Sequence, residues 1–295
     1  MTVAPAKRHL LAALTLAALA AFGAARTFAQ APQEALTEAD AGKSACVEGI
    51  VWQPDNATID PKGNWDRLGA GTLLVQWTVV DGMALVPGSG LPKLPEMPNW
   101  RRIAGEPWAR HVILGLAGFY SEPLARAGMR KLGALSERIA SLPTPLNVAG
   151  YYFPVEADPT WKDVKAFGRL LDSLPRPLWV SAYTAGELDP QQFADWVMDW
   201  LPRDVGLFFQ DGVGAHGRTP AMAAAYVAAL ERRLGRARLS VIVEAFRPAA
   251  GGGFRPTTAP ELKAQIAAMQ GRRIFLFDGP HYLPPDIVAA LACRR

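Results

Sequence analysis

The sequence predicts a single (β/α)₈ barrel of the α/β class, preceded by an N-terminal signal peptide. Eight short apolar runs, rich in Val, Ile, Phe, Tyr and Trp, alternate with amphipathic or alanine-rich stretches. Such alternation is typical of a parallel sheet that is buried on both faces. The eight units span roughly 250 residues, which is the usual size of this barrel.

The first 29 residues are predicted to be a secretory signal rather than part of the fold. Lys7 and Arg8 precede an apolar run over residues 10–25, and Thr27-Phe28-Ala29 places small residues at the usual cleavage positions. The apolar run is shorter than the ~20 residues of a membrane span, which disfavours the alternative of an uncleaved anchor. We expect cleavage before Gln30, a loose lead-in segment over residues 30–46 and the barrel domain over residues 47–295.

The eight apolar runs are the predicted strands of the barrel. In chain order they are Ile50–Pro54, Thr72–Val80, His111–Gly118, Val148–Glu156, Pro177–Tyr183, Val205–Asp211, Leu239–Phe246 and Ile274–Asp278. The clearest predicted helices cover residues 121–141, 159–174, 189–201, 220–234 and 260–270, with a short first helix near 64–69. An open doubly wound sheet is the alternative, but no glycine-rich nucleotide fingerprint follows the first strand.

Capping residues support the helix boundaries. Asp158-Pro159, Asp189-Pro190 and Thr219-Pro220 each place a capping side chain before a proline, which suits the first position of a helix. Gly235 and Gly271 follow two of the helical stretches, where glycine commonly ends a helix.

Two loops are expected on the face formed by the carboxyl ends of the strands, where barrels of this class carry their active sites. Residues 81–98 are rich in proline and are expected to be stiff. Residues 247–258 contain Gly251-Gly252-Gly253 and could form a mobile flap.

The two cysteines are predicted to form a disulfide. Cys46 precedes the first strand and Cys293 ends the last helix, and both places belong to the same rim of a barrel. An exported protein meets an oxidising compartment, where such a pair can close. Two free buried thiols are the alternative. With the signal peptide, this pair predicts a periplasmic or secreted protein.

Charge and motifs exclude several partners. The net charge is +4, and loss of the three cationic residues of the signal leaves +1, which gives no electrostatic footprint for nucleic acid or anionic lipid. No later segment is long enough to insert into a membrane. The sequence also lacks metal-binding His spacings, a P-loop and a nucleophile elbow, so we expect no metal and no cofactor.

Two carboxylates at strand ends are the candidate catalytic residues. Glu156 ends the fourth predicted strand and Glu244 ends the seventh, and these strands lie on opposite sides of the barrel mouth. Residue parity places each glutamate on one face with its alternate neighbours, so both can point inward. Hydrolysis of a glycosidic bond needs such a pair. Either glutamate could instead be a structural residue that pairs with a nearby Arg.

Polar and aromatic residues near the same strand ends are the candidate substrate-binding residues. They are Gln53, Gln76, Trp77, Tyr151, Tyr183, Gln210, Asp211, Phe246 and Tyr282. Aromatic rings can stack on the apolar faces of sugars while polar groups fix the hydroxyls. Tyr152 and Phe153 are expected to fill the core. Asp211 could be a catalytic carboxylate, orient one, or cap the following turn.

Five segments carry a resemblance to a known family. They are Asn64–Leu68, Leu74–Thr78, Gly150–Glu156, Phe209–Gly214 and Val243–Phe246. Together they resemble a bacterial family of unknown function that is described as glycoside-hydrolase-like TIM barrels and is often exported. More distantly, the chain resembles retaining glycosidases with catalytic glutamates after strands four and seven. That resemblance implies Glu156 as acid/base and Glu244 as nucleophile, although Val155 replaces the Asn that usually precedes the first glutamate.

These observations lead to three hypotheses of different classes. The first is an exported glycoside hydrolase, retaining in mechanism, that acts on a bacterial poly- or oligosaccharide. The second is a non-catalytic glycan-binding barrel accessory to polysaccharide export or assembly, which accommodates Val155. The third and least favoured is a protein-interaction scaffold, which would need an apolar patch away from the barrel mouth.

Overall fold

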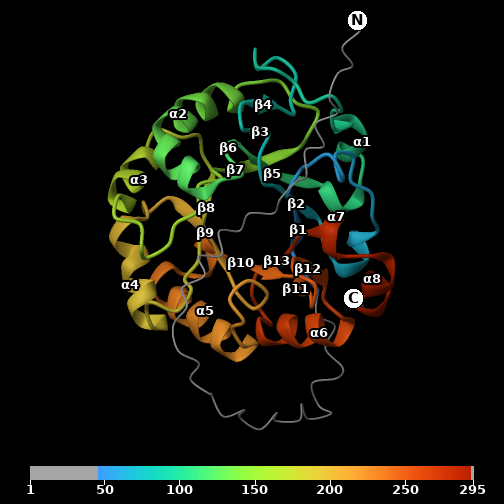
Figure 1. The fold of residues 1–295 in the computed structure, drawn as a ribbon, viewed down its shortest axis with the longest axis vertical. Coiled ribbons are helices and arrows are strands. Elements are labelled where there is room, and N and C mark those ends of the chain that lie inside the picture. Colours follow the sequence, from blue (N-terminus) through green and yellow to red (C-terminus); the bar gives the residue numbers. More distant parts are fainter. Residues whose placement is uncertain (1–45, 294–295) are drawn as a thin grey trace, which may run out of the picture.

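The computed structural model describes residues 46–293, so the predicted signal peptide and residues 30–45 of the predicted lead-in lie outside the described residues. Eight parallel strands form a closed barrel in the order β1-β13-β10-β9-β8-β7-β5-β2. Figure 1 shows these strands at the centre with helices arranged around them. The prediction of a (β/α)₈ barrel is confirmed.

The elements follow the predicted alternation along the chain. The barrel strands are β1 (Gly49–Trp52), β2 (Thr72–Val75), β5 (His111–Gly115), β7 (Val148–Tyr152), β8 (Leu178–Ala182), β9 (Val205–Gln210), β10 (Leu239–Glu244) and β13 (Ile274–Phe277). The helices are α1 (Trp100–Ala104), α2 (Glu122–Ala140), α3 (Val164–Leu171), α4 (Pro190–Trp200), α5 (Pro220–Leu234), α6 (Ala259–Ala268), α7 (Gly279–Tyr282) and α8 (Pro285–Ala290). Short 3₁₀ turns cover Trp65–Leu68, Pro107–Ala109 and Arg236–Arg238.

Side chains fill the interior of the barrel, because alternate residues of each strand point inward. The inward residues form one buried cluster: Val51, Leu74, Ile113, Tyr152, Phe208, Ile242 and Phe275. The phenyl ring of Phe208 packs edge-on against Phe275 with 5.0 Å between ring centroids. The interior is therefore a packed core, and a ligand can be held only above it.

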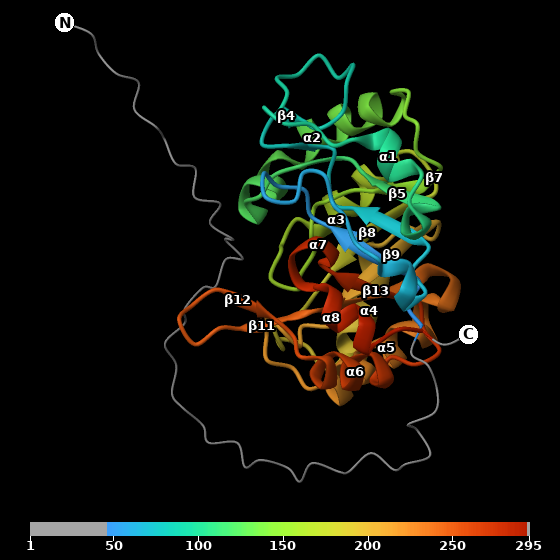
Figure 2. The ribbon, with the colours of Figure 1, turned by 90° about the vertical axis from the view of Figure 1, so that its right-hand side faces the viewer.

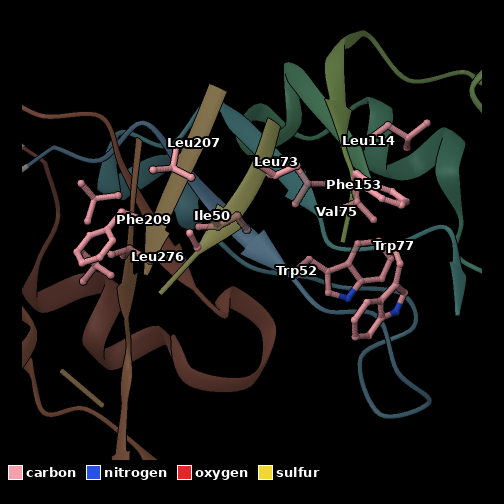
Figure 3. Packing of buried hydrophobic residues seen from close by; sticks show 14 of the residues in the cluster. Ile50, Trp52, Leu73, Val75, Trp77, Leu114, Phe153, Leu207, Phe209 and Leu276 are labelled. Carbon is pink, nitrogen blue, oxygen red and sulfur yellow. The ribbon is translucent and has the colours of Figure 1, made fainter. Parts of the chain in front are cut away.

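A second and larger apolar layer separates the strands from the helices. Outward-facing strand residues such as Ile50, Leu73, Leu207 and Leu276 are fully buried in it (Figure 3). Complete burial of each such side chain contributes about 1.5–3 kcal/mol. This layer fixes the strands and holds their carboxyl ends in place.

Several predicted strands end earlier than expected, and two of them continue after a break as strands of a separate sheet. The predicted strand 72–80 divides into β2 and β3 (Val79–Val80), and the strand 111–118 divides into β5 and β6 (Ala117–Gly118). The Thr78 hydroxyl donates a hydrogen bond to the Gly115 carbonyl at 2.7 Å across the break. Strands β3 and β6, with β4 (Met83–Ala84), then pair as a separate three-stranded sheet.

The glycine-rich loop after β10 is a hairpin rather than an irregular segment. Strands β11 (Phe246–Pro248) and β12 (Phe254–Pro256) pair antiparallel, and Gly252 and Gly253 take positive φ angles at its tip. Figure 2 shows this hairpin standing out from the body of the barrel. The expectation that it moves as a flap stays a prediction.

The predicted disulfide between Cys46 and Cys293 is present, with 5.0 Å between the two Cα atoms. It joins the segment before β1 to the segment after α8, and the Cys293 amide donates to the Arg67 carbonyl nearby. Within the described range, none of the helices has the length and apolar character that a bilayer crossing requires.

Candidate active site

A cavity of about 310 Å³ opens at the carboxyl ends of the barrel strands. Both predicted catalytic residues, Glu156 and Glu244, line it. Seven predicted substrate-binding residues line it as well: Gln53, Gln76, Trp77, Tyr183, Gln210, Phe246 and Tyr282. The fold thus brings most of the predicted site together around one hollow above the core.

Glu244 is held in a fixed orientation by backbone donors. It is the last residue of β10 and is only 4% exposed. Its Oε2 atom accepts hydrogen bonds from the amides of Gly214 and Ala215 at 2.7 and 2.8 Å. A side chain at position 214 would meet the Phe246 carbonyl, because a Cβ there would lie 2.6 Å from that oxygen. The turn after β9 therefore needs glycine to approach Glu244.

A second carboxylate lies behind Glu244. Asp211 is fully buried, and its Oδ1 accepts from the amides of Val213 and Glu244 at 3.2 and 3.3 Å. Burial and the neighbouring Asp211 charge raise the pKa of Glu244, while the two backbone donors lower it. Burial likewise raises the pKa of Asp211. Burial of both carboxyl groups and the closeness of their charges favour one negative charge over two in the pair.

Glu156 lies in a different environment. It is the fourth residue after the end of β7, and its half-buried side chain faces the cavity. Burial and the charge of Glu122 raise the pKa of Glu156 to about 7, although Gln210 and Arg126 act in the opposite direction. A carboxyl group with a pKa near neutrality can both donate and accept a proton at physiological pH.

Arg126 of α2 fixes the segment that carries Glu156. Its guanidinium donates from Nε and Nη2 to the Glu156 carbonyl at 3.1 and 3.0 Å. The same guanidinium forms ion pairs with the carboxylates of Glu122 and Asp158. The Tyr183 hydroxyl donates to Glu122 at 3.0 Å and so ties the end of β8 to this group.

A charged triad forms the wall beside β1 and β13. The Nε2 atom of His281 lies 3.1 Å from Asp55, and its Nδ1 atom lies 3.0 Å from Asp278. Burial lowers the pKa of His281, but its bonds to the two carboxylates outweigh this effect and raise the pKa to about 10. His281 is therefore an imidazolium whose charge is matched by its two partners. The Asp278 carboxylate also accepts a hydrogen bond from the backbone amide of Gln53 at 2.8 Å.

Aromatic pairs complete the walls of the cavity. The rings of Trp77 and Tyr120 pack edge-on with 4.8 Å between centroids. The Tyr183 ring stacks on His216 at 5.5 Å and an interplanar angle of 13°. On a third side, the rings of Phe246 and Tyr282 pack with 5.2 Å between their centroids. Rings on several sides of one hollow suit a ligand with apolar faces and polar edges.

Two predicted substrate-binding residues, Tyr151 and Asp211, do not line the cavity, and their contact with a ligand stays a prediction. Tyr151 points away from the barrel interior, and its hydroxyl donates to the Ala140 carbonyl of α2 at 3.3 Å. Tyr152, expected to be filler, belongs to the packed core of the barrel and also borders the cavity, because successive strand residues face opposite sides. Asp211 is covered by its own partners and supports Glu244 rather than reaching the hollow.

Several cavity residues were missed by sequence reasoning. Asp55, Tyr120 and Glu122 come from loops or a helix start rather than from strand ends. His281, whose place soon after the eighth strand is visible in the sequence, lies on the short helix α7. Among residues 46–293, no three or more His, Cys, Asp or Glu side chains are grouped so as to hold a metal ion.

Comparison with known proteins supports the fold. No protein-family model matches the chain, and no curated protein matches it significantly. A solved structure from Bacteroides thetaiotaomicron VPI-5482, provisionally described as an α-L-fucosidase, matches with a TM-score of 0.57 and 15% identity over 90% of this chain and 96% of that one. The PgaB (BpsB) glycoside hydrolase domain from Bordetella bronchiseptica matches with a TM-score of 0.49 and 15% identity over 82% of this chain and 95% of that one. The first of these matches supports the (β/α)₈ barrel fold, and at such identity the likeness is one of fold alone.

Proposed function

We propose that this chain is an exported glycoside hydrolase that cleaves a bacterial poly- or oligosaccharide with retention of configuration. The observation that carries the proposal is the presence of two glutamates, Glu156 and Glu244, in one cavity with aromatic walls. Paired carboxyl groups flanking a glycosidic bond are what this hydrolysis requires.

In the proposed mechanism, Glu156 is the acid/base and Glu244 is the nucleophile. The protonated carboxyl of Glu156 gives its proton to the glycosidic oxygen as the bond to the anomeric carbon breaks. A carboxylate oxygen of Glu244 forms a covalent bond to that carbon. Glu156, now a carboxylate, removes a proton from water, which attacks the same carbon and releases Glu244.

Two features of these environments support this division of roles, while the burial and the Asp211 charge that raise the pKa of Glu244 act against its ionised form. A pKa of about 7 allows Glu156 to alternate between acid and base. The Oε2 atom of Glu244 is fixed by two backbone donors, which leaves Oε1 to approach a sugar in one orientation. Preorganised positioning of this kind lowers the cost of reaching the reactive geometry. For export, the Cys46–Cys293 disulfide supports a periplasmic or secreted location.

The test is hydrolysis of a panel of bacterial polysaccharides by the purified mature protein and by its Glu156→Gln and Glu244→Gln variants. Both substitutions keep the size of the side chain and remove its acid–base or nucleophilic chemistry. We expect wild-type protein to release reducing ends from at least one polysaccharide, and each variant to lose this activity. Unchanged release by both variants would exclude the proposed roles.

Val155 favours a second candidate function, a non-catalytic glycan-binding barrel accessory to polysaccharide export or assembly. Its side chain is fully buried, so it offers no amide to a sugar hydroxyl in the place where the related glycosidases carry Asn. This alternative predicts calorimetric binding of a glycan without product release. It also predicts that Glu244→Gln leaves the affinity nearly unchanged.

A further inference from the structure

We infer that Tyr120, braced by Trp77, is an outer sugar-binding platform for a glycan chain that extends beyond the two glutamates. Its ligand would be a neutral or amino sugar unit removed from the bond that is cleaved. This inference rests on the proposed function and adds to it that the substrate is a chain rather than a single terminal sugar.

Exposure sets Tyr120 apart from the other aromatic residues of the cavity. Large exposed hydrophobic side chains in the described range are Tyr120 at 41%, Leu124 at 59% and Met222 at 49%. Of these, Tyr120 alone also lines the cavity. Its ring thus belongs both to the hollow and to the outer surface, which is the position of a rim residue that a chain would cross.

The Tyr120 ring is rigidly held despite its exposure. Its hydroxyl donates to the Pro54 carbonyl at 3.1 Å, and the Trp77 indole donates to the same carbonyl at 3.2 Å. The Tyr120 amide donates to Asp81 at 3.3 Å, and its ring packs edge-on against Trp77. A ring that is already fixed loses little conformational entropy when a ligand stacks on it.

The position of the platform implies a chain that crosses the mouth. Trp77 follows β2 and Tyr120 follows β6, so the platform lies over the β1–β2–β5 side of the barrel. On the β10–β13 side, the rings of Phe246 and Phe254 pack with 4.6 Å between their centroids. Both residues belong to the β11–β12 hairpin, which projects from the barrel (Figure 2). The carboxylate of Glu244 comes from the end of β10, away from the Tyr120 platform in the strand order. Aromatic surfaces on both sides favour a substrate longer than one unit.

Charges around the platform define the class of sugar. The side chains of Asp55 and Glu122 are 21% and 26% exposed, and both line the cavity with Tyr120. No Lys or Arg belongs to the cavity lining within residues 46–293. The cation that does line it, His281, is already paired with two carboxylates. A uronate or sulfated sugar would meet like charge without a counter-ion, whereas a neutral or amino sugar would not.

The test measures binding by calorimetry to the mature protein carrying Glu244→Gln, which prevents turnover. The probes are β-1,4-linked dimers and hexamers of glucose, N-acetylglucosamine and glucosamine, with hexagalacturonate as the anionic probe. We expect Tyr120→Ala to weaken binding of a hexamer at least tenfold and of the matching dimer less than twofold. Tyr120→Phe, which keeps the ring, should retain hexamer affinity within about threefold. Met222→Ala, which removes an exposed side chain from α5, should change neither affinity.

Each other outcome overturns a defined part of the argument. Equal losses for dimer and hexamer, or no loss for either, would overturn the outer platform while leaving the proposed function intact. Binding of hexagalacturonate as tightly as the other hexamers would overturn the sugar class. Failure of every oligomer to bind the parent protein would overturn this inference, while the polysaccharide panel decides the proposed function separately.

Discussion

The two glutamates of the cavity differ in what surrounds their carboxyl groups. Glu244 accepts two hydrogen bonds from backbone amides, whereas the carboxyl of Glu156 is influenced by side chains, with Glu122, Gln210 and Arg126 as the main neighbours. Backbone donors do not titrate and hardly move. Side chains can be exchanged by mutation and can titrate themselves. The surroundings of Glu244 therefore fix the orientation of its carboxylate, while the surroundings of Glu156 set its proton affinity.

The difference follows from where each residue lies along its strand. Glu244 still belongs to β10, and its place is set by the hydrogen-bond ladder of the barrel. Glu156 lies beyond the end of β7 and beyond Pro154, which has no amide to continue a ladder. The guanidinium of Arg126 holds the Glu156 carbonyl in place of strand pairing.

The largest expected effect comes from separating the two roles with an activated substrate. Glu156→Gln should lower kcat/KM for the polysaccharide by roughly 10²–10⁴-fold, because protonation of a poor leaving group is lost. The same variant should still release dinitrophenol from an aryl glycoside of the same sugar, since that leaving group needs no proton. Glu244→Gln should lose both activities. If Glu244→Gln were the variant that kept aryl glycoside cleavage, the two assignments would have to be exchanged.

A smaller effect is expected from disturbing the backbone donors of Glu244. In Gly214→Ala the new methyl group would meet the Phe246 carbonyl, so the turn must move away from the Glu244 carboxylate. Overpacking of this kind costs about 1–3 kcal/mol of folding free energy. We expect a lower Tm and a fall in kcat larger than any rise in KM. Gly251→Ala in the hairpin is the matched control, because a Cβ there meets nothing within 4 Å.

Opposite shifts of the pH profile are expected from two substitutions near Glu156. The acid must be protonated, so activity should fall as pH rises through the pKa of Glu156, which is about 7. Glu122→Gln removes a negative charge, lowers this pKa and moves the alkaline limb to lower pH. Arg126→Gln removes a positive charge and moves the limb to higher pH.

The measurement for this pair is kcat/KM from pH 4 to 10 with wild type as reference. If a substitution only damaged the structure, kcat/KM would fall by the same factor at every pH, and the midpoint of the alkaline limb would not shift. Shifts in the same direction for Glu122→Gln and Arg126→Gln would contradict the electrostatic role given to both residues.

The smallest effect on the site is expected from removing the disulfide. Replacing Cys46 and Cys293 together by Ser should reduce the free energy of unfolding by about 2–5 kcal/mol, as measured by denaturant titration. Because the bond lies away from the cavity lining, kcat and the pH profile should stay close to wild type at temperatures where the variant is folded. A changed pH profile would mean that the disulfide also affects the surroundings of Glu156 or Glu244.

The barrel could be predicted because each of its units repeats the same local signals. Buried strands such as Val205–Gln210 are apolar on both faces, and the caps Asp189 and Thr219 accept hydrogen bonds from the amides of Gln192 and Met222 as expected. Asp158 misled the assignment of α3, because its carboxylate accepts from the Thr160 amide in a turn instead. That helix begins at Val164, later than predicted.

The site could be predicted only in part, because strand ends are visible in a sequence while loop geometry is not. Glu244 and Gln210 end strands, and their inward direction follows from residue parity. Tyr151 was assigned to the site because it lies near the end of a strand, whereas residue parity along β7 turns Tyr152 inward and Tyr151 outward. Glu122 reaches the cavity through the packing of α2, which no local pattern in the sequence encodes.

The bond between Cys46 and Cys293 closes 247 positions of chain into a covalent circle. A protease that cuts once within this circle, for example at the glycine tip of the β11–β12 hairpin, would open the ring without releasing a fragment. The fragment that carries both Glu156 and Glu244 would remain tethered to the fragment that carries β13. The two pieces of a nicked molecule would stay joined until a reductant was added, which would protect the proposed exported enzyme against a single proteolytic cut.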